Sequence, residues 1–172
     1  MTIHFGDSTS IATATGLGAK ILKYATFTHE GYATGNYTGA APNNSSMGYQ
    51  LFSTSYTPAA ADSTCVVISS TVTVNEASNF TNHFHLALWN GGGFVSAVGG
   101  SARYTSFASY LNFASLNYVG SFASGNTSAR NIMMRVGCND NGILYINGNP
   151  NSSGTITGSS NRFTALLLEI AA

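Results

Sequence analysis

The chain has 172 residues, of which only six are basic and six acidic, so its formal net charge is zero and 7% of its residues are charged. An ordinary soluble domain carries about 25% charged residues. The six Lys and Arg residues are scattered along the chain, which excludes the basic cluster of a nucleic-acid-binding protein and the basic helix of a membrane-surface protein.

The rest of the composition predicts one folded domain with an uncharged polar surface. Hydrophobic residues make up 44% of the chain and aromatic residues 12%, which is enough to fill a core. Ser, Thr, Asn and Gly together supply 77 residues, so hydroxyls and amides replace ions on the surface. Residues 1–18 lack the basic start and apolar centre of a signal peptide, so we expect the mature chain to begin near Met1.

Residues 1–19 differ from the rest because they are small and flexible and carry only isolated apolar side chains. We expect an N-terminal arm for assembly contacts that packs on a neighbouring subunit or partner. Such an arm can add to the edge of a neighbour's sheet and use a few apolar side chains as anchors. The expected anchors are Ile3, Phe5, Ile11 and Leu17.

From residue 20 to residue 172 the pattern predicts a single all-β domain. Apolar and polar residues alternate with a period of two, and β-branched and aromatic residues are frequent, as in half-buried strands. The predicted strands cover residues 20–28, 49–56, 65–74, 83–89, 130–138, 143–146 and 163–170, and strands are favoured over a helix in 103–123. Long loops are expected in 29–48, 90–106 and 147–161. The Asn139–Gly142 turn is expected to join 130–138 and its return strand 143–146 as a hairpin.

Eight or nine strands separated by turns predict an antiparallel β-sandwich of jelly-roll type. An immunoglobulin-like sandwich is the alternative, although the chain is long for it and lacks its Cys–Trp–Cys spacing. Cys65 and Cys138 lie in or beside apolar strands, which favours two buried thiols. A disulfide between them stays open because the sequence gives no distance.

The search for chemistry yields one pair of candidate metal ligands, His83 and His85. Two residues apart on a strand, they share a face and could contribute to a zinc or nickel site. A closed site needs more ligands, so a partly exposed polar strand face beside Trp89 is the favoured interpretation. The chain has no Gly-x-Ser-x-Gly elbow and no phosphate-binding loop, so we expect neither an enzyme nor a cofactor. Glu169 is expected to form a structural ion pair with an arginine.

The order of several motifs is similar to that of a known group of proteins. The chain begins MTIHFGDSTSIATATGLGAKIL, has a Thr-Pro-x-small turn over Thr57–Ser63, and ends with RNIMMRVG, GILYINGN and ALLLEIAA. This order resembles small virion proteins of tailed bacteriophages, particularly marine cyanophages, that are tail-fibre-like or structural. The resemblance implies a jelly-roll knob that acts as a homotrimer on the virion surface after synthesis in the host cytoplasm. It implies no catalytic residues.

The sequence leaves three possible functions. A capsid decoration or cement protein of the phage head is favoured, because the chain is one compact domain with an assembly arm. A receptor-binding tail-fibre tip is the alternative, since Asn, Gly, Ser and Tyr in loops suit contact with a glycan. A polysaccharide depolymerase is the weakest. The expected partners are further copies of the chain, the major capsid protein or another virion protein and, for a fibre tip, a host surface glycan. Neither nucleic acid nor a membrane is expected.

Overall fold

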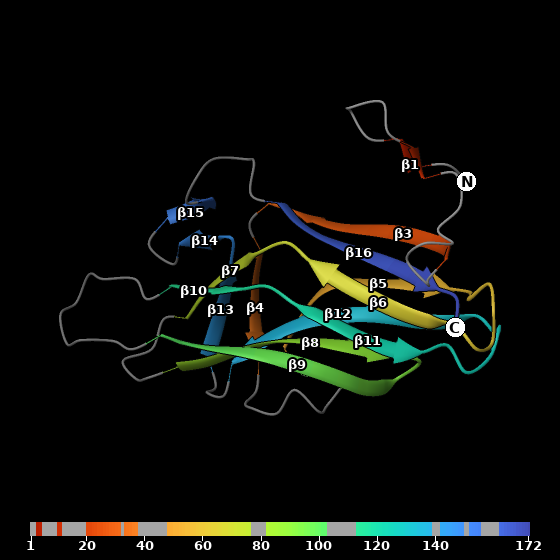
Figure 1. Cartoon of the computed structure of the whole chain (residues 1–172). Coiled ribbons are helices and arrows are strands. Elements are labelled where there is room, and N and C mark those ends of the chain that lie inside the picture. The colour runs from red at the N-terminus through yellow and green to blue at the C-terminus, as the bar shows by residue number, and fades with distance from the viewer. Residues whose placement is uncertain are drawn as a thin grey trace.

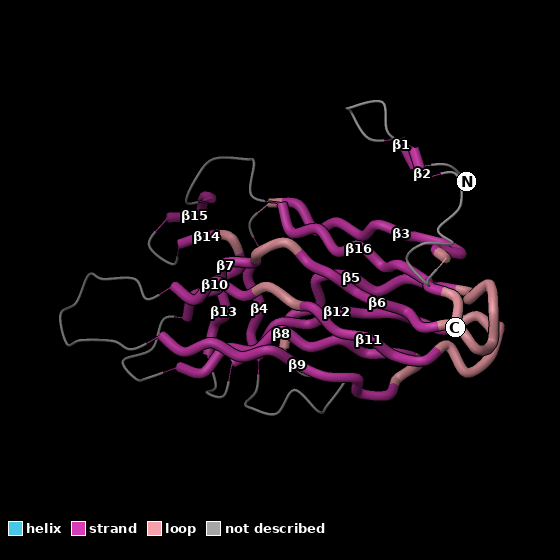
Figure 2. The backbone as a smooth tube through the Cα atoms, viewed as in Figure 1, coloured by secondary structure: helices cyan, strands magenta, loops and turns pink. Residues whose placement is uncertain are grey.

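The computed structural model describes the backbone of residues 3–4, 10–11, 20–31, 33–37, 48–76, 82–102, 113–138, 142–149, 152–155 and 162–172. Sixteen strand segments account for most of these residues, and no helix occurs among them (Figure 2). The strands are β1 (Ile3–His4), β2 (Ser10–Ile11), β3 (Ile21–Glu30), β4 (Ala33–Tyr37), β5 (Tyr49–Tyr56), β6 (Thr64–Ser69), β7 (Val72–Glu76), β8 (Asn82–Asn90), β9 (Gly93–Ala102), β10 (Phe113–Leu116), β11 (Val119–Ala123), β12 (Arg130–Cys138), β13 (Gly142–Ile146), β14 (Gly148–Asn149), β15 (Ser152–Thr155) and β16 (Arg162–Ile170).

Two four-stranded sheets form the body of the molecule, and every pairing in them is antiparallel (Figure 1). The first has the strand order β11-β6-β16-β3, and the second has the order β5-β12-β8-β9. If these eight strands are counted along the chain, the first sheet holds the first, eighth, third and sixth strands, and the second holds the second, seventh, fourth and fifth. This interleaving is the jelly-roll arrangement, so the predicted fold class is confirmed.

A third sheet, β10-β7-β13-β4, continues the first one beyond a break in the chain. Ser69 ends β6, and Ser70 begins the break between β6 and β7. Their amides donate to the carbonyls of Tyr118 (2.8 Å) and Thr164 (2.7 Å), and their hydroxyls accept from the amides of the same two residues (both 2.8 Å). Because the serine side chains replace ladder partners, the chain leaves one sheet and enters the next without orphaned amides.

This break corrects the prediction of one continuous strand over residues 65–74. The alternation predicted that Val66, Ile68, Val72 and Val74 share a face, but Val72 and Val74 are fully buried while Ile68 is 41% exposed. Val67, which the alternation placed on the opposite face, is buried in β6 together with Cys65. The two irregular residues between the strands shift the phase of the alternation.

Asn147 holds the third sheet together at the end of β13. It is 3% exposed and has a φ of +54°, a left-handed conformation that asparagine tolerates better than most residues. Its amide donates to the Thr73 carbonyl at 2.8 Å, and its side-chain oxygen accepts from the Thr73 amide at 3.3 Å. Its side-chain nitrogen donates to the Gly31 carbonyl at 3.4 Å. One side chain therefore ties β13 to β7 and to the end of β3.

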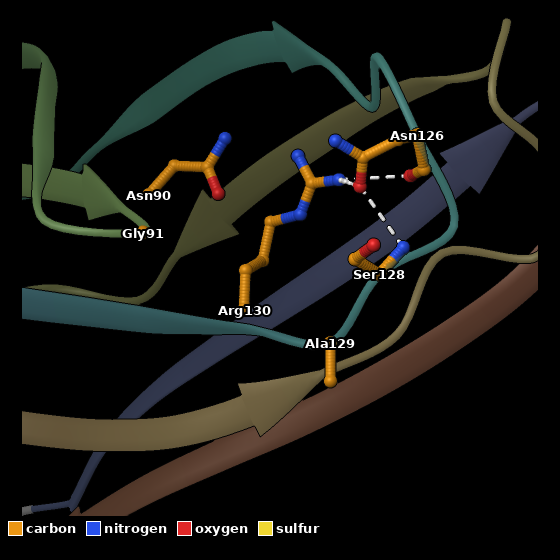
Figure 3. Close-up of a pocket in the computed structure, with 6 residues that line it drawn as sticks. All are labelled: Asn90, Gly91, Asn126, Ser128, Ala129 and Arg130. Atoms are coloured by element: carbon orange, nitrogen blue, oxygen red, sulfur yellow. Dashed lines mark hydrogen bonds between the residues drawn. The ribbon is translucent and has the colours of Figure 1, made fainter.

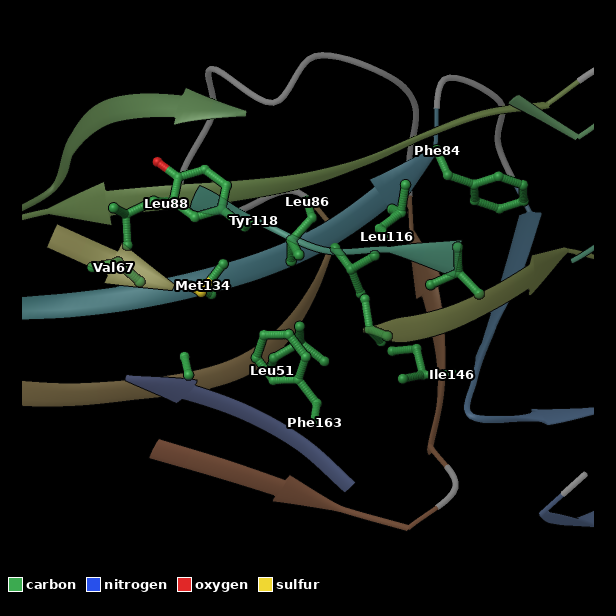
Figure 4. Close-up of a cluster of buried hydrophobic side chains, with 14 of the residues drawn as sticks. Leu51, Val67, Phe84, Leu86, Leu88, Leu116, Tyr118, Met134, Ile146 and Phe163 are labelled. Atoms are coloured by element: carbon green, nitrogen blue, oxygen red, sulfur yellow. The ribbon is translucent and has the colours of Figure 1, made fainter. Parts of the chain in front are cut away.

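The hydrophobic core fills the space between the two main sheets (Figure 4). Both sheets contribute fully buried side chains, and the largest are aromatic and branched aliphatic residues, as close packing requires. They include Val67, Phe84, Leu86, Leu88, Tyr118, Ile132, Met134, Phe163 and Leu167. In β12 burial alternates from Asn131 to Val136, as the predicted period of two requires.

Several predicted loops and turns are wrong in detail. Segment 29–48 contains the end of β3 and all of β4, and 90–106 contains β9 up to residue 102. The strand over 143–146 does not return along β12, because β13 pairs with β4 and β7 instead. The short hairpin of β14 and β15 lies within 147–161. Local turn signals predicted where the chain bends but not which sheet it enters afterwards.

Candidate functional site

The outward side of the sheet β11-β6-β16-β3 carries no charged side chain over three successive rows of paired residues. We call these twelve residues the apolar face. They are Ile21, Tyr24 and Thr26 on β3, Thr64, Val66 and Ile68 on β6, Val119, Ser121 and Ala123 on β11, and Leu166, Leu168 and Ile170 on β16. The register places Val119, Ile68, Leu166 and Thr26 in one row, so the apolar side chains of neighbouring strands are direct neighbours.

The apolar face is open in the single chain. Val119 is 63% exposed, Tyr24 54%, Ile68 41% and Ile21 37%, and these are four of the five exposed large hydrophobic residues among the residues described. Charged side chains occur at one end of this sheet, where Arg162 forms an ion pair with Glu30. A contiguous apolar surface of this kind is typical of a protein interface.

The outward side of the opposite sheet, β5-β12-β8-β9, has a different character, because its polar side chains bond to one another. Asn131 donates to the Ser53 hydroxyl at 2.7 Å. Arg135 donates to the Gln50 side chain at 3.3 Å and to the Gly48 carbonyl at 2.6 Å. These bonds lie on the surface and satisfy polar groups within the sheet itself.

The two candidate metal ligands, His83 and His85, both lie on β8 as predicted. His85 is half-buried against Gly137, where an added Cβ would come within 2.6 Å of its Nε2, and burial lowers its pKa. Among the described residues, no three His, Cys, Asp or Glu side chains converge on a point that could hold a metal ion. On the same face of β8, His83 is exposed but Ala87 and Trp89 are buried, so the predicted polar face is exposed at one end only.

Glu169 is fully buried, and it is not the ion-pair partner of an arginine that the sequence suggested. It accepts hydrogen bonds from the Tyr56 hydroxyl (2.7 Å), the Ser63 hydroxyl (2.6 Å) and the amides of Ala59 (2.8 Å) and Ala60 (2.9 Å). The turn over 57–63 wraps around the carboxylate, so neutral donors replace the expected cation. The arginine of the described ion pair is Arg162, and its partner is the exposed Glu30.

The environment of Glu169 also sets the pKa values of its neighbours. Burial acts to raise the pKa of Glu169, but the hydrogen bonds from Ser63, Ala59, Tyr56 and Ala60 outweigh it and lower the pKa to about 2. Burial and the nearby Glu169 charge raise the pKa of Cys65 to about 11. The same two causes, together with the hydrogen bond to Glu169, raise the pKa of Tyr56 well above its usual range.

Both cysteines are buried thiols, as the favoured interpretation predicted. Cys65 lies on β6 beside Glu169, and Cys138 ends β12 in the other main sheet. A buried thiol with a raised pKa is a poor nucleophile at neutral pH. Cys65 therefore acts as a small core residue rather than a reactive group.

A polar pocket of about 370 Å³ lies at one end of the sandwich (Figure 3). The end of β8 supplies Asn90 and the turn after it Gly91, while the connection from β11 supplies Asn126 and Ser128 and the start of β12 supplies Arg130. Sequence analysis did not identify this pocket. The available signal was Asn126, whose side-chain oxygen accepts from the Ser128 amide two residues later at 2.9 Å and so shapes the connection.

The N-terminal arm is described only in part. Ile3 lies in β1 and Ile11 in β2, and these residues pair directly in a two-stranded antiparallel sheet. Phe5 and Leu17 lie outside the described residues. The four predicted anchors and the boundary of the arm at residue 19 therefore stay predictions.

Within the described ranges, no helix has the length and apolar character needed to cross a membrane. No family model matches the chain, and no curated protein matches it.

Solved structures with a similar course of the backbone share little sequence with this chain. Dimeric latent PorU from Porphyromonas gingivalis matches 85% of this chain with a TM-score of 0.42 and 11% identity. The VP2 subviral particle of infectious bursal disease virus matches 86% with a TM-score of 0.36 and 12% identity, and T=1 particles derived from that virus match 87% with a TM-score of 0.37 and 11% identity. The chain spans only 12%, 41% and 39% of the lengths of these proteins. At these scores the likeness assigns no family and no role.

Proposed function

We propose that this protein is a non-enzymatic structural protein of a bacteriophage virion, a homotrimeric decoration or cement protein on the surface of the head. The observation that carries the proposal is the apolar face, which a second copy of the chain would cover in the assembly. The motif order that resembles small phage virion proteins supports the same role.

The chemistry of the apolar face suits contact between identical chains. Burying charged groups is costly unless each finds a partner, and the twelve residues of this face include no charged group to bury. The net charge of the chain is zero, so copies approach one another without long-range repulsion. Covering Val119 and Ile68, which are 63% and 41% exposed, would remove apolar surface from water and stabilise the assembly.

Two measurements test the proposal. Light scattering coupled to size exclusion should give three times the mass of the chain, and a monomer at all concentrations would contradict the trimer. A density map of intact virions should place the chain on the head shell. A position on the tail would instead favour the receptor-binding alternative.

The arm provides a separate test of the contact with the shell. Deletion of residues 1–18 should leave a folded trimer that no longer binds capsids, because the predicted anchors Ile3, Phe5, Ile11 and Leu17 are removed. Unchanged capsid binding by the shortened chain would rule out the arm as the anchor.

A receptor-binding tail-fibre tip is the second candidate, and one observation favours it. The polar pocket around Arg130 lies between two exposed connections, where binding residues are often found. Host-cell adsorption by isolated trimers would support this role, and its absence would favour decoration of the head.

A further inference from the structure

The end strands β3 and β5 of the two main sheets lie side by side at one edge of the sandwich. They belong to different sheets, and among the described pairings no backbone ladder joins them. Three side-chain contacts cross this edge instead, each between one residue of β3 and one of β5, and we call them the β3–β5 seam. They are Lys23 with Tyr56 (4.9 Å from the ammonium nitrogen to the ring centre), Phe27 with Phe52 (4.6 Å between ring centres) and His29 with Tyr49 (5.5 Å between ring centres).

His29 is the residue of the seam whose charge changes close to neutral pH. Its ring meets the Tyr49 ring edge-on, with an angle of 71° between the two planes. Its Nε2 is buried and has no hydrogen-bond partner in the described part of the chain. A charged ring needs water or an acceptor at this nitrogen, whereas a neutral ring can leave it unbonded at a smaller cost. The closed seam therefore suits the neutral form of His29.

The elements packed around His29 offer no counter-charge within the described residues. On β16 the paired residue is Phe163, which is fully buried, and on β5 the ring in contact is Tyr49. Beside the partner of Tyr49 on β12 lies Arg135, a cation, whose guanidinium donates to the Gly48 carbonyl at 2.6 Å. Strand β4, which follows β3, contains no Asp, Glu, His, Lys or Arg. None of these groups would stabilise a proton on His29.

The carboxylate nearest to His29 along the chain lies on the other side of the sheet. Glu30 directly follows His29, and successive residues of a strand point to opposite faces. Glu30 is exposed on the outward face, where it forms the ion pair with Arg162. A protonated His29 ring in the closed seam would therefore lack both an acceptor and a counter-charge among the described residues.

His29 also lies next to the point where the chain leaves the first sheet for the third. Gly31 turns the chain between β3 and β4 with a φ of +80°, and an added Cβ there would meet nothing within 4 Å. The side-chain nitrogen of Asn147 donates to the Gly31 carbonyl at 3.4 Å, which is long for a hydrogen bond. The end of the seam at His29 is thus beside a loosely held turn.

We propose that His29 is a pH-sensitive switch that opens this end of the β3–β5 seam below neutral pH. At neutral pH the uncharged ring packs on Tyr49 and keeps the edge of the sandwich closed. When the ring takes up a proton, it leaves the seam and reaches water, because no described group inside the seam accepts its hydrogen bonds. Strands β3 and β5 then separate at that end, while the other two contacts hold the rest of the seam. This switch goes beyond the proposed structural role and does not depend on it.

The closed seam binds a proton on His29 more weakly than the open seam does. In the open seam His29 meets water and titrates near its ordinary pKa of 6.5, whereas burial lowers that pKa in the closed seam. The closed seam is therefore fully favoured above pH 6.5. Each pH unit below that value raises the open population by up to about tenfold, until the closed form takes up the proton as well.

The test is an NMR titration of the full-length, isotope-labelled protein from about pH 7.5 to about pH 5. Ring signals of the four histidines report the protonation of each, and the Tyr49 ring signals report the contact with His29. We expect the Tyr49 signals to change together with the titration of His29. Protection of amides from hydrogen exchange, corrected for the intrinsic exchange rate, should fall by up to about tenfold per pH unit beside His29 and Tyr49. At the other end of the seam, beside Lys23 and Tyr56, it should stay within about twofold.

Two variants carry the same substitution at different histidines. His29→Phe keeps a ring against Tyr49 but cannot take up a proton, so the pH response of the seam should disappear. His83→Phe changes an exposed histidine of the opposite sheet and should leave the response as it is in the native chain.

Four results would overturn the proposal. They are titration of His29 at or above its ordinary pKa, Tyr49 signals that ignore this titration, a pH response that persists in His29→Phe, and a response that is lost equally in His83→Phe. None of them depends on where the protein lies in the virion or on its oligomeric state, so a failure here is distinct from a failure of the structural role.

Discussion

The two outward sheet faces of this sandwich come from the same backbone pattern but have opposite chemistry. On β5-β12-β8-β9 the polar groups of Ser53, Asn131 and Arg135 bond within the sheet. Phe94, 43% exposed and edge-on to Trp89 at 5.4 Å, is the exposed large hydrophobic residue described there. On β11-β6-β16-β3 an uncharged surface, apolar except for three Ser or Thr side chains, takes the place of that polar network.

On one face the polar groups already have partners within the single chain, whereas on the other face apolar side chains remain exposed to water. A partner adds little stability to a face whose polar groups are already bonded. On an exposed apolar face, a partner stabilises the assembly in proportion to the apolar area that it removes from water.

The largest effect should come from charges placed on the apolar face. The double variant Val119→Lys with Ile68→Lys should weaken self-association by about a thousandfold. It removes two aliphatic side chains that the assembly would bury, at a cost on the order of 4 kcal/mol. Sedimentation equilibrium over a range of concentrations measures the change.

The matched control places the same charges on the opposite sheet. Ser53→Lys with Ser55→Lys changes two exposed residues of β5 and should leave self-association nearly unchanged. If both double variants dissociate the assembly equally, general charge repulsion rather than the apolar face explains the loss.

The next effect concerns the inward side of the first sheet. Glu169→Gln should lower the free energy of unfolding by about 3 kcal/mol, because an amide cannot accept all the hydrogen bonds that the buried carboxylate receives. Urea unfolding measures it. The exposed Glu30→Gln should cost less than about 1 kcal/mol, and equal losses would show that Glu169 is not special.

The same carboxylate predicts how stability depends on pH. Its pKa is lowered from 4.5 to about 2 in the folded chain, so the unfolded chain binds the proton more tightly. Its contribution to stability is fully present above pH 4.5 and disappears as the pH falls towards about 2. The difference in stability between the native chain and Glu169→Gln should shrink over this window. If this difference in unfolding free energy stays constant from about pH 6 to about pH 2, the charge of Glu169 does not contribute to stability as proposed.

How far the sequence predicts this molecule is clearest in β16. Alternation correctly divides it into one face with Leu166 and Leu168 and another with Leu167 and Glu169. It cannot tell which face lies inward, because both are apolar, and the face that carries the acid is the buried one. The donors that make burial of Glu169 possible come from residues more than a hundred positions away in the sequence. The partner of β13 is equally non-local, which explains why the predicted hairpin with β12 is wrong.

The sequence predicted that the chain assembles with other proteins, but not which residues form the contact surface. The predicted arm and the motif order indicated an assembly, yet residues of the apolar face come from four strands that are distant in the chain. The pocket likewise joins Asn90 to Arg130, which become neighbours only when β8 pairs with β12. Only the fold brings such residues together.

The smallest effect should come from salt. Ionic strength screens exposed pairs, and the described ion pair of Arg162 and Glu30 lies at the end of the apolar face with both side chains more than half exposed. Such a pair contributes about 0.5 kcal/mol, so assembly should weaken by less than about threefold between low and high salt. Apolar contacts, in contrast, are not screened. Self-association measured at several salt concentrations decides the matter: a steep loss at high salt would show that charges, not the apolar face, hold the copies together.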